Sequence, residues 1–528
     1  MPPDLRQPAR TSRRTRSSRP SRALALAAAG ALALPLAACT SDPDPSPTGS
    51  PSTAAAATPG PRTYRTVDMQ APPLPMTHGP AAADADDADE GLYVLAPKKK
   101  AEPHLGGLMV DATGEPVWID PGETPTYDLR VQEYQGKPVL TYFTGESEKW
   151  VGHGAGDIHV LDTSYREVAK VTTGGDLAPH TADLHDSTIT PDGTMLLTSY
   201  PVVQTDLTAV GGDKDGYVFD GVVQEVDIAT GTVLHEWSAL DHVDLADTYA
   251  SVEPAKEGGD PSGTKDAPFD FFHVNSARLT PDGDLLISSR QYHAAYAVDR
   301  ESGDVRWTLG GKDSDFTMQG SGDGDEPGTG AQFAWQHDVE MHDDGTVTVF
   351  DNEGDPGVGD HSRGLRLALD MDTMTASVDQ EWLPSDPKRR AGSQGNLQVL
   401  DDGNVVVGWG DAQWSSEYTA DGTLVREFPL LGGETYRTYR FDWHATPTNP
   451  PAVVVEAGTA YASWNGATEV ASWRLVAGDD ESSAQPVATV PRAGFETALA
   501  PVPDGAAYVA VEALDADGKV LGTGTPAA

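Results

Sequence analysis

The sequence predicts an all-β protein: a six-bladed β-propeller followed by a small C-terminal β-sandwich of the immunoglobulin or fibronectin-III type. Short apolar runs recur between Gly and Asp turns, many of these runs end in Trp, and no long stretch of the repeat region has the 3.6-residue periodicity of a helix. The 55 glycines and 41 prolines among 528 residues also favour a turn-rich fold over a helical bundle.

The repeat that predicts the propeller extends over residues 90–447. One half of it is a Gly turn followed by a β-rich run, as in the segment that starts at Gly193 and the one that starts at Gly283. The other half is an Asp, a turn with Gly and a strand that ends in Trp, as in Asp227–Trp237. Such strands and their variants without Trp end near residues 118, 169, 237, 307, 382 and 428, which predicts six blades of about four antiparallel strands.

The segments outside the repeat predict three further parts. Residues 448–528 alternate between apolar and polar side chains and form the expected sandwich. Residues 1–38 combine an arginine-rich start with the apolar run Ala23–Ala38, which is typical of an export signal. Leu36-Ala-Ala-Cys39 resembles the lipobox of bacterial lipoproteins, so we expect lipid attachment at Cys39 and a location on the outer face of the cell membrane. Residues 39–89, rich in Ser, Thr, Pro, Ala and Asp, are expected to be a disordered linker.

Charge and cysteine content exclude several classes of partner. The formal net charge is −45, which argues against nucleic acid and against electrostatic docking on anionic lipid. The expected membrane contact is therefore the lipid anchor alone. A single cysteine excludes an internal disulfide framework and a Cys-based zinc cluster.

Three histidines occupy equivalent places in the repeat. His185, His273 and His337 precede the Gly of the next Asp-Gly turn by eight, ten and eight residues. Because the innermost strands of a propeller face one channel, these imidazoles should converge. Asn275 lies two residues beyond His273 on the same strand face, and Arg290 closes the following strand.

Two kinds of site fit these residue types. Three histidines could hold zinc, but the only recurring carboxylates, Asp186 and Asp338, directly follow histidines and should point to the opposite strand face. The alternative, which we favour, is an anion pocket in which Arg290, Asn275 and imidazoles bind a tetrahedral oxyanion. We therefore expect neither a metal nor a cofactor.

The order of these motifs resembles that of the aryl-sulfate sulfotransferase family. The resemblance rests on His273-Val-Asn-Ser, the strand that ends in Arg290, Phe333-Ala-Trp-Gln-His337-Asp and Val349-Phe-Asp-Asn352, and it covers most of residues 90–447. It implies a six-bladed propeller that moves a sulfuryl group from an aryl sulfate donor to a phenolic acceptor without adenosine-phosphosulfate.

The resemblance also implies a role for each candidate residue. His337 matches the nucleophilic histidine, which would form a sulfohistidine in a ping-pong reaction. His185, His273, Asn275 and Arg290 match the residues that hold the sulfuryl group. The main alternative is a non-catalytic surface propeller that binds a sulfated or aromatic ligand or a partner protein. A quinone-dependent dehydrogenase is disfavoured because imidazoles, rather than carboxylates, mark the channel.

Overall fold

The structure is a computed structural model of the whole chain. It describes residues 60–83, 91–98, 104–122, 124–147, 151–177, 179, 181–252, 262–320, 330–353, 361–431 and 433–526. The chain divides into a unit of residues 1–58 and a unit of residues 59–528, and all described residues belong to the second. The predicted signal peptide, Cys39 and the first part of the predicted linker lie outside the described residues.

Six sheets follow one another along the described part of the chain and share one strand order. The first contains β7 (Thr126–Tyr134), β8 (Lys137–Ser147), β9 (Gly154–Leu161) and β10 (Glu167–Val171). The second contains β11 (Ser187–Ile189), β12 (Thr194–Ser199), β15 (Val222–Asp227) and β16 (Val233–Ser238). The third contains β18 (Val274–Leu279), β19 (Leu285–Ser289), β20 (Ala294–Val298) and β21 (Val305–Gly310).

The remaining three sheets complete this series. The fourth contains β23 (His337–Met341), β24 (Thr346–Asp351), β25 (Arg363–Asp370), β26 (Thr375–Trp382) and the short edge strand β22 (Thr317–Met318). The fifth contains β27 (Asn396–Val399), β28 (Val405–Gly408), β29 (Trp414–Tyr418), β30 (Leu424–Pro429) and β3 (Thr77–His78). The sixth joins β31 (Thr438–Phe441) to β4 (Leu92–Leu95), β5 (Leu108–Val110) and β6 (Pro116–Ile119).

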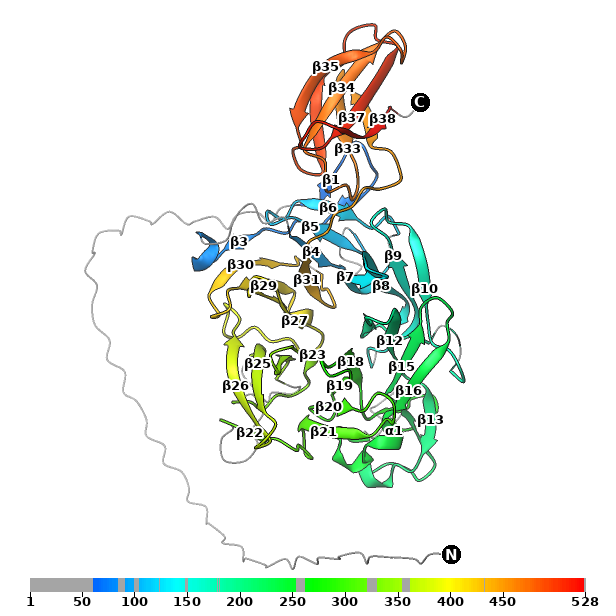
Figure 1. Cartoon of the computed structure of the whole chain (residues 1–528), viewed down its shortest axis with the longest axis vertical. Coiled ribbons are helices and arrows are strands. Elements are labelled where there is room, and N and C mark those ends of the chain that lie inside the picture. The colour runs from blue at the N-terminus through cyan, green and yellow to red at the C-terminus, as the bar shows by residue number, and fades with distance from the viewer. Residues whose placement is uncertain are drawn as a thin grey trace, which may run out of the picture. The chain divides into compact units, whose positions relative to one another are not determined.

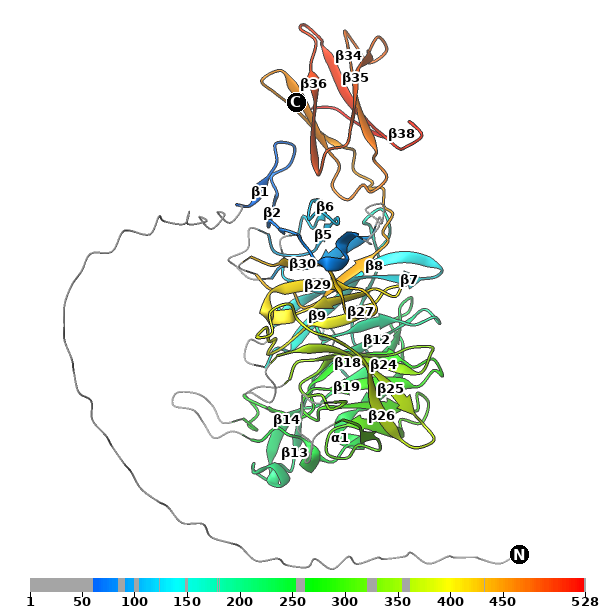
Figure 2. The ribbon, with the colours of Figure 1, turned by 90° about the vertical axis from the view of Figure 1, so that its left-hand side faces the viewer.

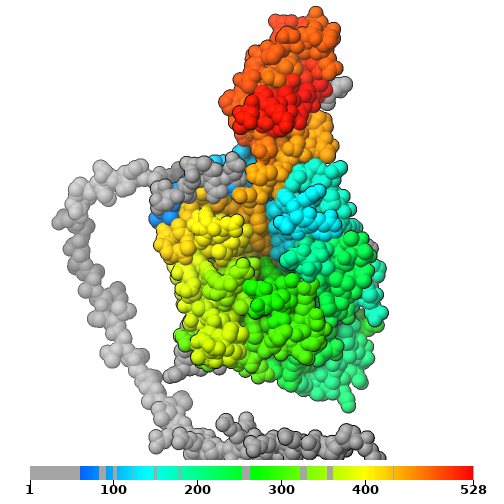
Figure 3. Space-filling model, viewed as in Figure 1, coloured from blue at the N-terminus to red at the C-terminus, as the bar shows by residue number. Residues whose placement is uncertain are grey.

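These sheets form a closed series around a common centre, which we call the ring (Figure 1, and Figure 2 from the side). The first strand of each sheet lies innermost, and β7, β11, β18, β23, β27 and β31 contact one another in that order. The late strand β31 pairs with the early strand β4, with Thr438 opposite Leu95. Figure 3 shows the segments of the ring succeeding one another from cyan through green to yellow.

The elements of the ring agree with the sequence pattern. The second strand of a sheet follows the predicted Gly turn, where Gly193 has a φ of 78° that a residue with a Cβ rarely adopts. The strands that lie fourth from the centre carry the predicted aromatic residues, such as Trp237 on β16 and Trp382 on β26, which are 2% and 1% exposed. Packing of these rings between sheets explains why they recur. The prediction of an all-β protein is confirmed.

An insertion interrupts the second sheet and leads into the third. It forms a three-stranded sheet of β13 (Val202–Thr205), β14 (Gly216–Phe219) and β17 (Phe269–Asp270), in which β14 and β17 are parallel. Helical elements are short: α1 (Ala239–His242), η1 (Pro80–Ala83), η2 (Thr208–Val210), η3 (Leu245–Asp247) and η4 (Gly410–Ala412). Among the described residues, no helix has the length and apolar character needed to span a bilayer.

The prediction of disorder up to residue 89 is wrong for residues 60–83. This segment contains β1 (Arg62–Thr63), β2 (Gln70–Ala71) and β3, and β3 extends the fifth sheet by pairing with β30. Leu74, 2% exposed, packs in a core cluster that includes Tyr93 and Phe428. The many prolines make this segment resemble a linker. Its few apolar side chains become buried only through contacts with strands that are distant in the sequence.

The C-terminal residues form two further sheets. One contains β32 (Ala452–Glu456), β33 (Thr459–Ser463) and β36 (Glu496–Pro501), and the other contains β34 (Ser472–Gly478), β35 (Gln485–Pro491), β37 (Tyr508–Leu514) and β38 (Val520–Gly524). A core cluster that includes Trp464, Trp473 and Val511 draws on both sheets.

Candidate active site

The innermost strands bring the predicted residues into one buried cluster. His185 lies just before β11, His273 just before β18, and His337 begins β23; their exposed fractions are 4%, 1% and 1%. The rings of His185 and His273 have their centroids 4.9 Å apart. Arg290, which follows β19, places Nη1 3.3 Å from His273 Nε2. The equivalent strand positions therefore converge in space.

The hydrogen bonds of His337 fix its tautomer. Nδ1 lies 2.8 Å from Asn352 Oδ1 and 3.1 Å from the carbonyl oxygen of Trp335. Asn352 is oriented by its own amide group, which donates to the carbonyl oxygens of Ala391 and Gln394. Both neighbours of Nδ1 are acceptors, so Nδ1 carries the proton. Nε2 then holds the lone pair, which accepts a hydrogen bond from the backbone N–H of Gln394 at 3.2 Å.

The surroundings of His337 keep this imidazole neutral. Burial is the largest cause of a pKa well below the usual value for histidine, and the charge of Arg290 lowers the pKa further. His185 and His273 also lower the pKa of His337, while the hydrogen bond to Asn352 raises it. An unprotonated imidazole with a defined lone pair is the form that can attack an electrophile.

His185 and His273 have carboxylate partners where His337 has an amide. His185 Nδ1 lies 2.6 Å from Asp183 Oδ2, and His273 Nδ1 lies 2.6 Å from Asp270 Oδ2. A carboxylate at Nδ1 holds the ring orientation and stabilises the imidazolium that forms when Nε2 takes up a proton. The three imidazoles are therefore not chemically equivalent.

Within each of these pairs, burial and the charge of the partner shift the pKa in opposite directions. Burial, followed by the charge of Arg290, lowers the pKa of His273 to about 3, although Asp270 partly compensates. Burial alone would raise the pKa of Asp183, but His185 and His153 hold it below its usual value. In the resting site, His273 is a neutral ring whose proton lies on Nδ1, and its Nε2 accepts from Arg290.

Asn275 and Arg290 have more contacts than the sequence could indicate. The amide nitrogen of Asn275 donates to the carbonyl oxygen of Gln336 at 2.6 Å, so one of its two hydrogens is already used. The guanidinium of Arg290 lies over the ring of Trp335, with Cζ 4.3 Å from the centroid. This stacking fixes the plane of the guanidinium beside His273.

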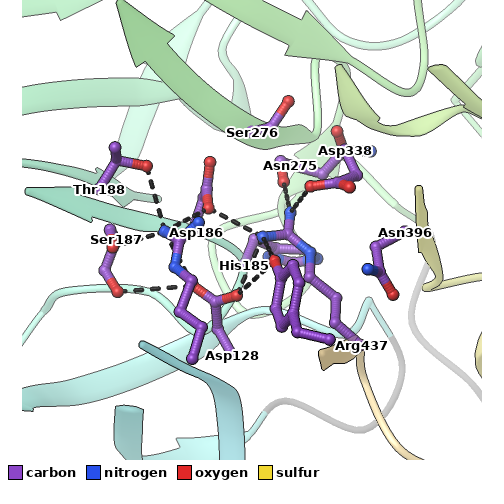
Figure 4. Close-up of polar contacts among 12 residues, drawn as sticks. Asp128, His185, Asp186, Ser187, Thr188, Asn275, Ser276, Asp338, Asn396 and Arg437 are labelled. Atoms are coloured by element: carbon purple, nitrogen blue, oxygen red, sulfur yellow. Dashed lines mark hydrogen bonds and ion pairs between the residues drawn. The ribbon is translucent and has the colours of Figure 1, made fainter. Parts of the chain in front are cut away.

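The carboxylates that follow the histidines point away from this cluster, as strand alternation predicts. Asp186 and Asp338 face the centre of the ring, where Arg437 lies between Asp128, Asp186 and Asp338 (Figure 4). Nη1 of Arg437 donates to Asp128 and to Asp186, each at 2.9 Å. Arg130 also donates to Asp186 at 2.9 Å. We call these five residues the axial charge network.

Comparisons with known proteins identify the family. Residues 130–429 match the profile of the arylsulfotransferase (ASST) family. The chain belongs to the arylsulfotransferase family. The matched range contains His185, His273, Asn275, Arg290 and His337, together with their partners Asp183, Asp270 and Asn352. No curated protein matches the chain.

Solved structures resemble this arylsulfotransferase-family chain only distantly. A catalytically inactive virginiamycin B lyase from Staphylococcus aureus with quinupristin is 13% identical, with a TM-score of 0.32, and covers 66% of this chain and 94% of its own. A protein from Lactobacillus plantarum is 14% identical, with a TM-score of 0.32, and covers 78% and 99%. A β-propeller domain from Myceliophteria thermophila is 10% identical, with a TM-score of 0.30, and covers 66% and 96%.

Several residues of this arylsulfotransferase-family site escaped sequence reasoning. Asp183 and Asp270 lie two and three residues before their histidines, and this spacing is a signal that could have been read. His153, 2% exposed, precedes β9 and has no counterpart in the repeat. Its Nε2 lies 3.3 Å from His273 Nδ1, and its ring stacks on Tyr200 with centroids 3.5 Å apart.

Proposed function

We propose that the chain transfers a sulfuryl group from an aryl sulfate to a phenol through a sulfohistidine at His337. The observation that carries the proposal is the tautomer of His337: Asn352 and Trp335 hold the proton on Nδ1, and the lone pair lies on Nε2 beside Arg290 and two further imidazoles. The membership of the arylsulfotransferase family agrees with this chemistry.

In the first half-reaction, Nε2 of His337 attacks the sulfur atom of the donor. A bond forms between this nitrogen and sulfur, the bond between sulfur and the aryl oxygen breaks, and its electron pair leaves with the phenolate. The backbone N–H of Gln394, which now occupies the lone pair, is released by the attack and can donate to a sulfuryl oxygen. Arg290 offsets the negative charge on the sulfuryl oxygens.

His185 is the imidazole that we assign to proton transfer. Its Nδ1 is bonded to Asp183, so a second proton on Nε2 gives an imidazolium beside a buried carboxylate. This proton passes to the departing phenolate. In the second half-reaction, the acceptor phenol returns a proton to His185, its oxygen attacks sulfur, and the bond from sulfur to His337 breaks.

His273 serves mainly to position Arg290. With its proton on Nδ1, its Nε2 accepts a hydrogen bond from Arg290 at 3.3 Å, which aligns the guanidinium that Trp335 stacks against. We assign Asn275 to the same supporting shell, because its amide ties β18 to the residue before His337.

The scaffold and location complete the proposal. We infer that the six sheets of the ring are the blades of a β-propeller and that the two C-terminal sheets are a β-sandwich. The lipobox-like segment before Cys39 supports a lipoprotein held at the outer face of the membrane.

A labelling experiment tests the mechanism. The chain is incubated with 4-nitrophenyl sulfate without an acceptor, and its peptides are weighed by mass spectrometry. We expect one added sulfuryl group on the peptide that contains His337. His337→Asn should lose both this label and steady-state transfer to phenol, by at least about a thousandfold. His342→Asn, just beyond the opposite end of β23, is the matched control and should retain both.

The same experiment distinguishes the proposed sulfuryl transfer from the alternative function. A non-catalytic propeller would retain an aryl sulfate without release of 4-nitrophenol and without label on any histidine. Transfer at the wild-type rate by His337→Asn would show that the nucleophile is another residue.

A further inference from the structure

The Nδ1 edge of His273, which faces away from Arg290, forms a second group of side chains with His153 and Asp270. His153, Asp270 and His273 come from three separate places in the chain: the segment before β9, the end of β17 and the segment before β18. Their exposed fractions are 2%, 9% and 1%. In the proposed transfer reaction, Asp270 only holds the ring of His273, and His153 has no role.

Two distances within this group match the edges of a tetrahedral metal site, whereas His273 Nδ1 and Asp270 Oδ2 are hydrogen-bonded at 2.6 Å. His153 Nε2 lies 3.3 Å from His273 Nδ1 and 3.4 Å from Asp270 Oδ1. Ligand atoms about 2.0–2.1 Å from a tetrahedral zinc ion are about 3.3 Å apart. Octahedral coordination at the same bond length would bring neighbouring ligands to about 3.0 Å. The two measured edges therefore fit zinc geometry.

An unsatisfied oxygen gives independent support. Asp270 Oδ1 is buried and meets the geometry of a hydrogen bond with no residue that the structure describes, although it lies 3.4 Å from His153 Nε2. A buried carboxylate oxygen without a donor is costly unless a cation or a water satisfies it. This oxygen lies on the His153 side of the carboxylate, where the two imidazole nitrogens also converge.

We propose that His153 Nε2, His273 Nδ1 and one oxygen of Asp270 bind a zinc ion, with a fourth position open. Binding displaces the proton of His273 Nδ1, which now bonds to Asp270 Oδ2 at 2.6 Å, and the carboxylate turns to place one oxygen on the ion. Two carboxylates, Asp270 and the nearby Asp183, balance the double positive charge.

The packing around His153 holds its ring in place for this role. Tyr200 stacks on one face, and Phe219 meets the ring edge-on with centroids 4.8 Å apart. The hydroxyl of Tyr200 donates to the carbonyl oxygen of Val274, next to His273, which couples the two ligand-bearing segments. With the metal on Nδ1, neutral His273 carries its proton on Nε2 and can no longer accept the hydrogen bond from Arg290, so the metal-bound form is distinct from the form that the proposed transfer reaction uses.

Metal binding is measured on the full chain, prepared without a polyhistidine tag and stripped with a chelator. We expect one equivalent of Co²⁺ or Zn²⁺ to remain after desalting, and the cobalt form to show the intense visible absorption of tetrahedral coordination. His153→Gln and Asp270→Asn should each lose the absorption and lower the affinity at least about tenfold. His444→Gln, which removes an exposed histidine that pairs with Glu469, should retain both.

The wild-type chain alone also tests the site, whatever the variants do to folding. Zn²⁺ should raise its unfolding temperature, because the ion binds the folded site. Absence of both retained metal and thermal shift would overturn the proposal, as would equal retention by a folded His153→Gln. No aryl sulfate is present, so this result does not depend on whether His337 is sulfated.

Discussion

At the scale of single residues, the partner of each imidazole Nδ1 decides what that imidazole can do. His337 has the neutral amide oxygen of Asn352, which fixes a tautomer and opposes the lowering of its pKa only in part. His185 and His273 have the carboxylates of Asp183 and Asp270 at Nδ1, and Asp270 raises the pKa of His273 against the effect of burial. One buried cluster thus holds the proposed nucleophile and the proposed proton carrier, both of them histidines.

The pH dependence of transfer tests the role of the amide. Because the pKa of His337 lies well below its usual value, wild-type kcat/KM should not fall as the pH decreases through about 6.5, the ordinary histidine pKa. Asn352→Asp places a carboxylate at Nδ1 and raises the pKa of His337. Its acidic limb should therefore move to higher pH by at least about one unit.

The control for this change is Asn404→Asp, in the turn before β28, which should keep the wild-type pH profile. An unshifted profile in Asn352→Asp would contradict the assignment of His337 as the titrating nucleophile.

The leaving group tests the proton carrier. Asp183→Asn removes the carboxylate behind His185 and should lower transfer from phenyl sulfate by about a hundredfold. Transfer from 4-nitrophenyl sulfate should fall much less, because 4-nitrophenolate leaves without protonation. Measured kcat values for the two donors give the comparison, and an equal loss for both would assign Asp183 to structure alone.

The sequence could predict those site residues that share a place in the repeat. His185, His273 and His337 can be recognised because each lies eight or ten residues before the Gly of an Asp-Gly turn. His153 and Gln394 lie outside this pattern and meet the site only because the ring closes. Their roles depend on long-range contacts that a single sequence does not encode locally.

At the scale of elements, strand order follows from the turns and from aromatic spacing. Gly turns open the second strands, as predicted, and Trp-bearing strands such as β16 and β26 lie fourth from the centre in their sheets. The segment of residues 60–83 shows where this reasoning fails, because composition suggested a linker. Its apolar side chains are too few to form a core alone, but Leu74 packs in a core cluster with residues of β4 and β30.

The stability of the ring tests the role of this segment. Leu74→Ala should lower the free energy of unfolding by about 2–5 kcal/mol, because it leaves a cavity in a formed core. Leu383→Ala, at a residue that is 47% exposed, should change it little. Urea denaturation followed by tryptophan fluorescence gives both values, and equal stability of the two variants would restore the prediction of a linker.

At the scale of the whole molecule, a chain with a net charge of −45 keeps some of its arginines inside. Arg437 is fully buried in the axial charge network, and it contacts carboxylates carried by β7 and by the segment before β11. Burial alone would raise the pKa of Asp186, but Arg437 and Arg130 hold it below its usual value. The network therefore ties separate sheets together by charge.

Removal of the Arg437 side-chain charge should destabilise the fold. Arg437→Met leaves Asp128 and Asp186 undercompensated and should lower the free energy of unfolding by about 3–5 kcal/mol. Arg166→Met removes an ion pair whose arginine is 68% exposed, and it should cost less than about 1 kcal/mol. Chemical denaturation of both variants checks the difference, and a neutral Arg437→Met would mean that the sheets hold together by packing alone.

The axial charge network also bears on how substrates approach the site. Arg437 and its carboxylates occupy the centre of the ring beside the histidines, so we expect donor and acceptor to approach His337 from the side away from this network. In the proposed ping-pong reaction, the phenol released from the donor leaves before the acceptor binds in the same place. Added 4-nitrophenol should therefore compete with the acceptor in steady-state kinetics.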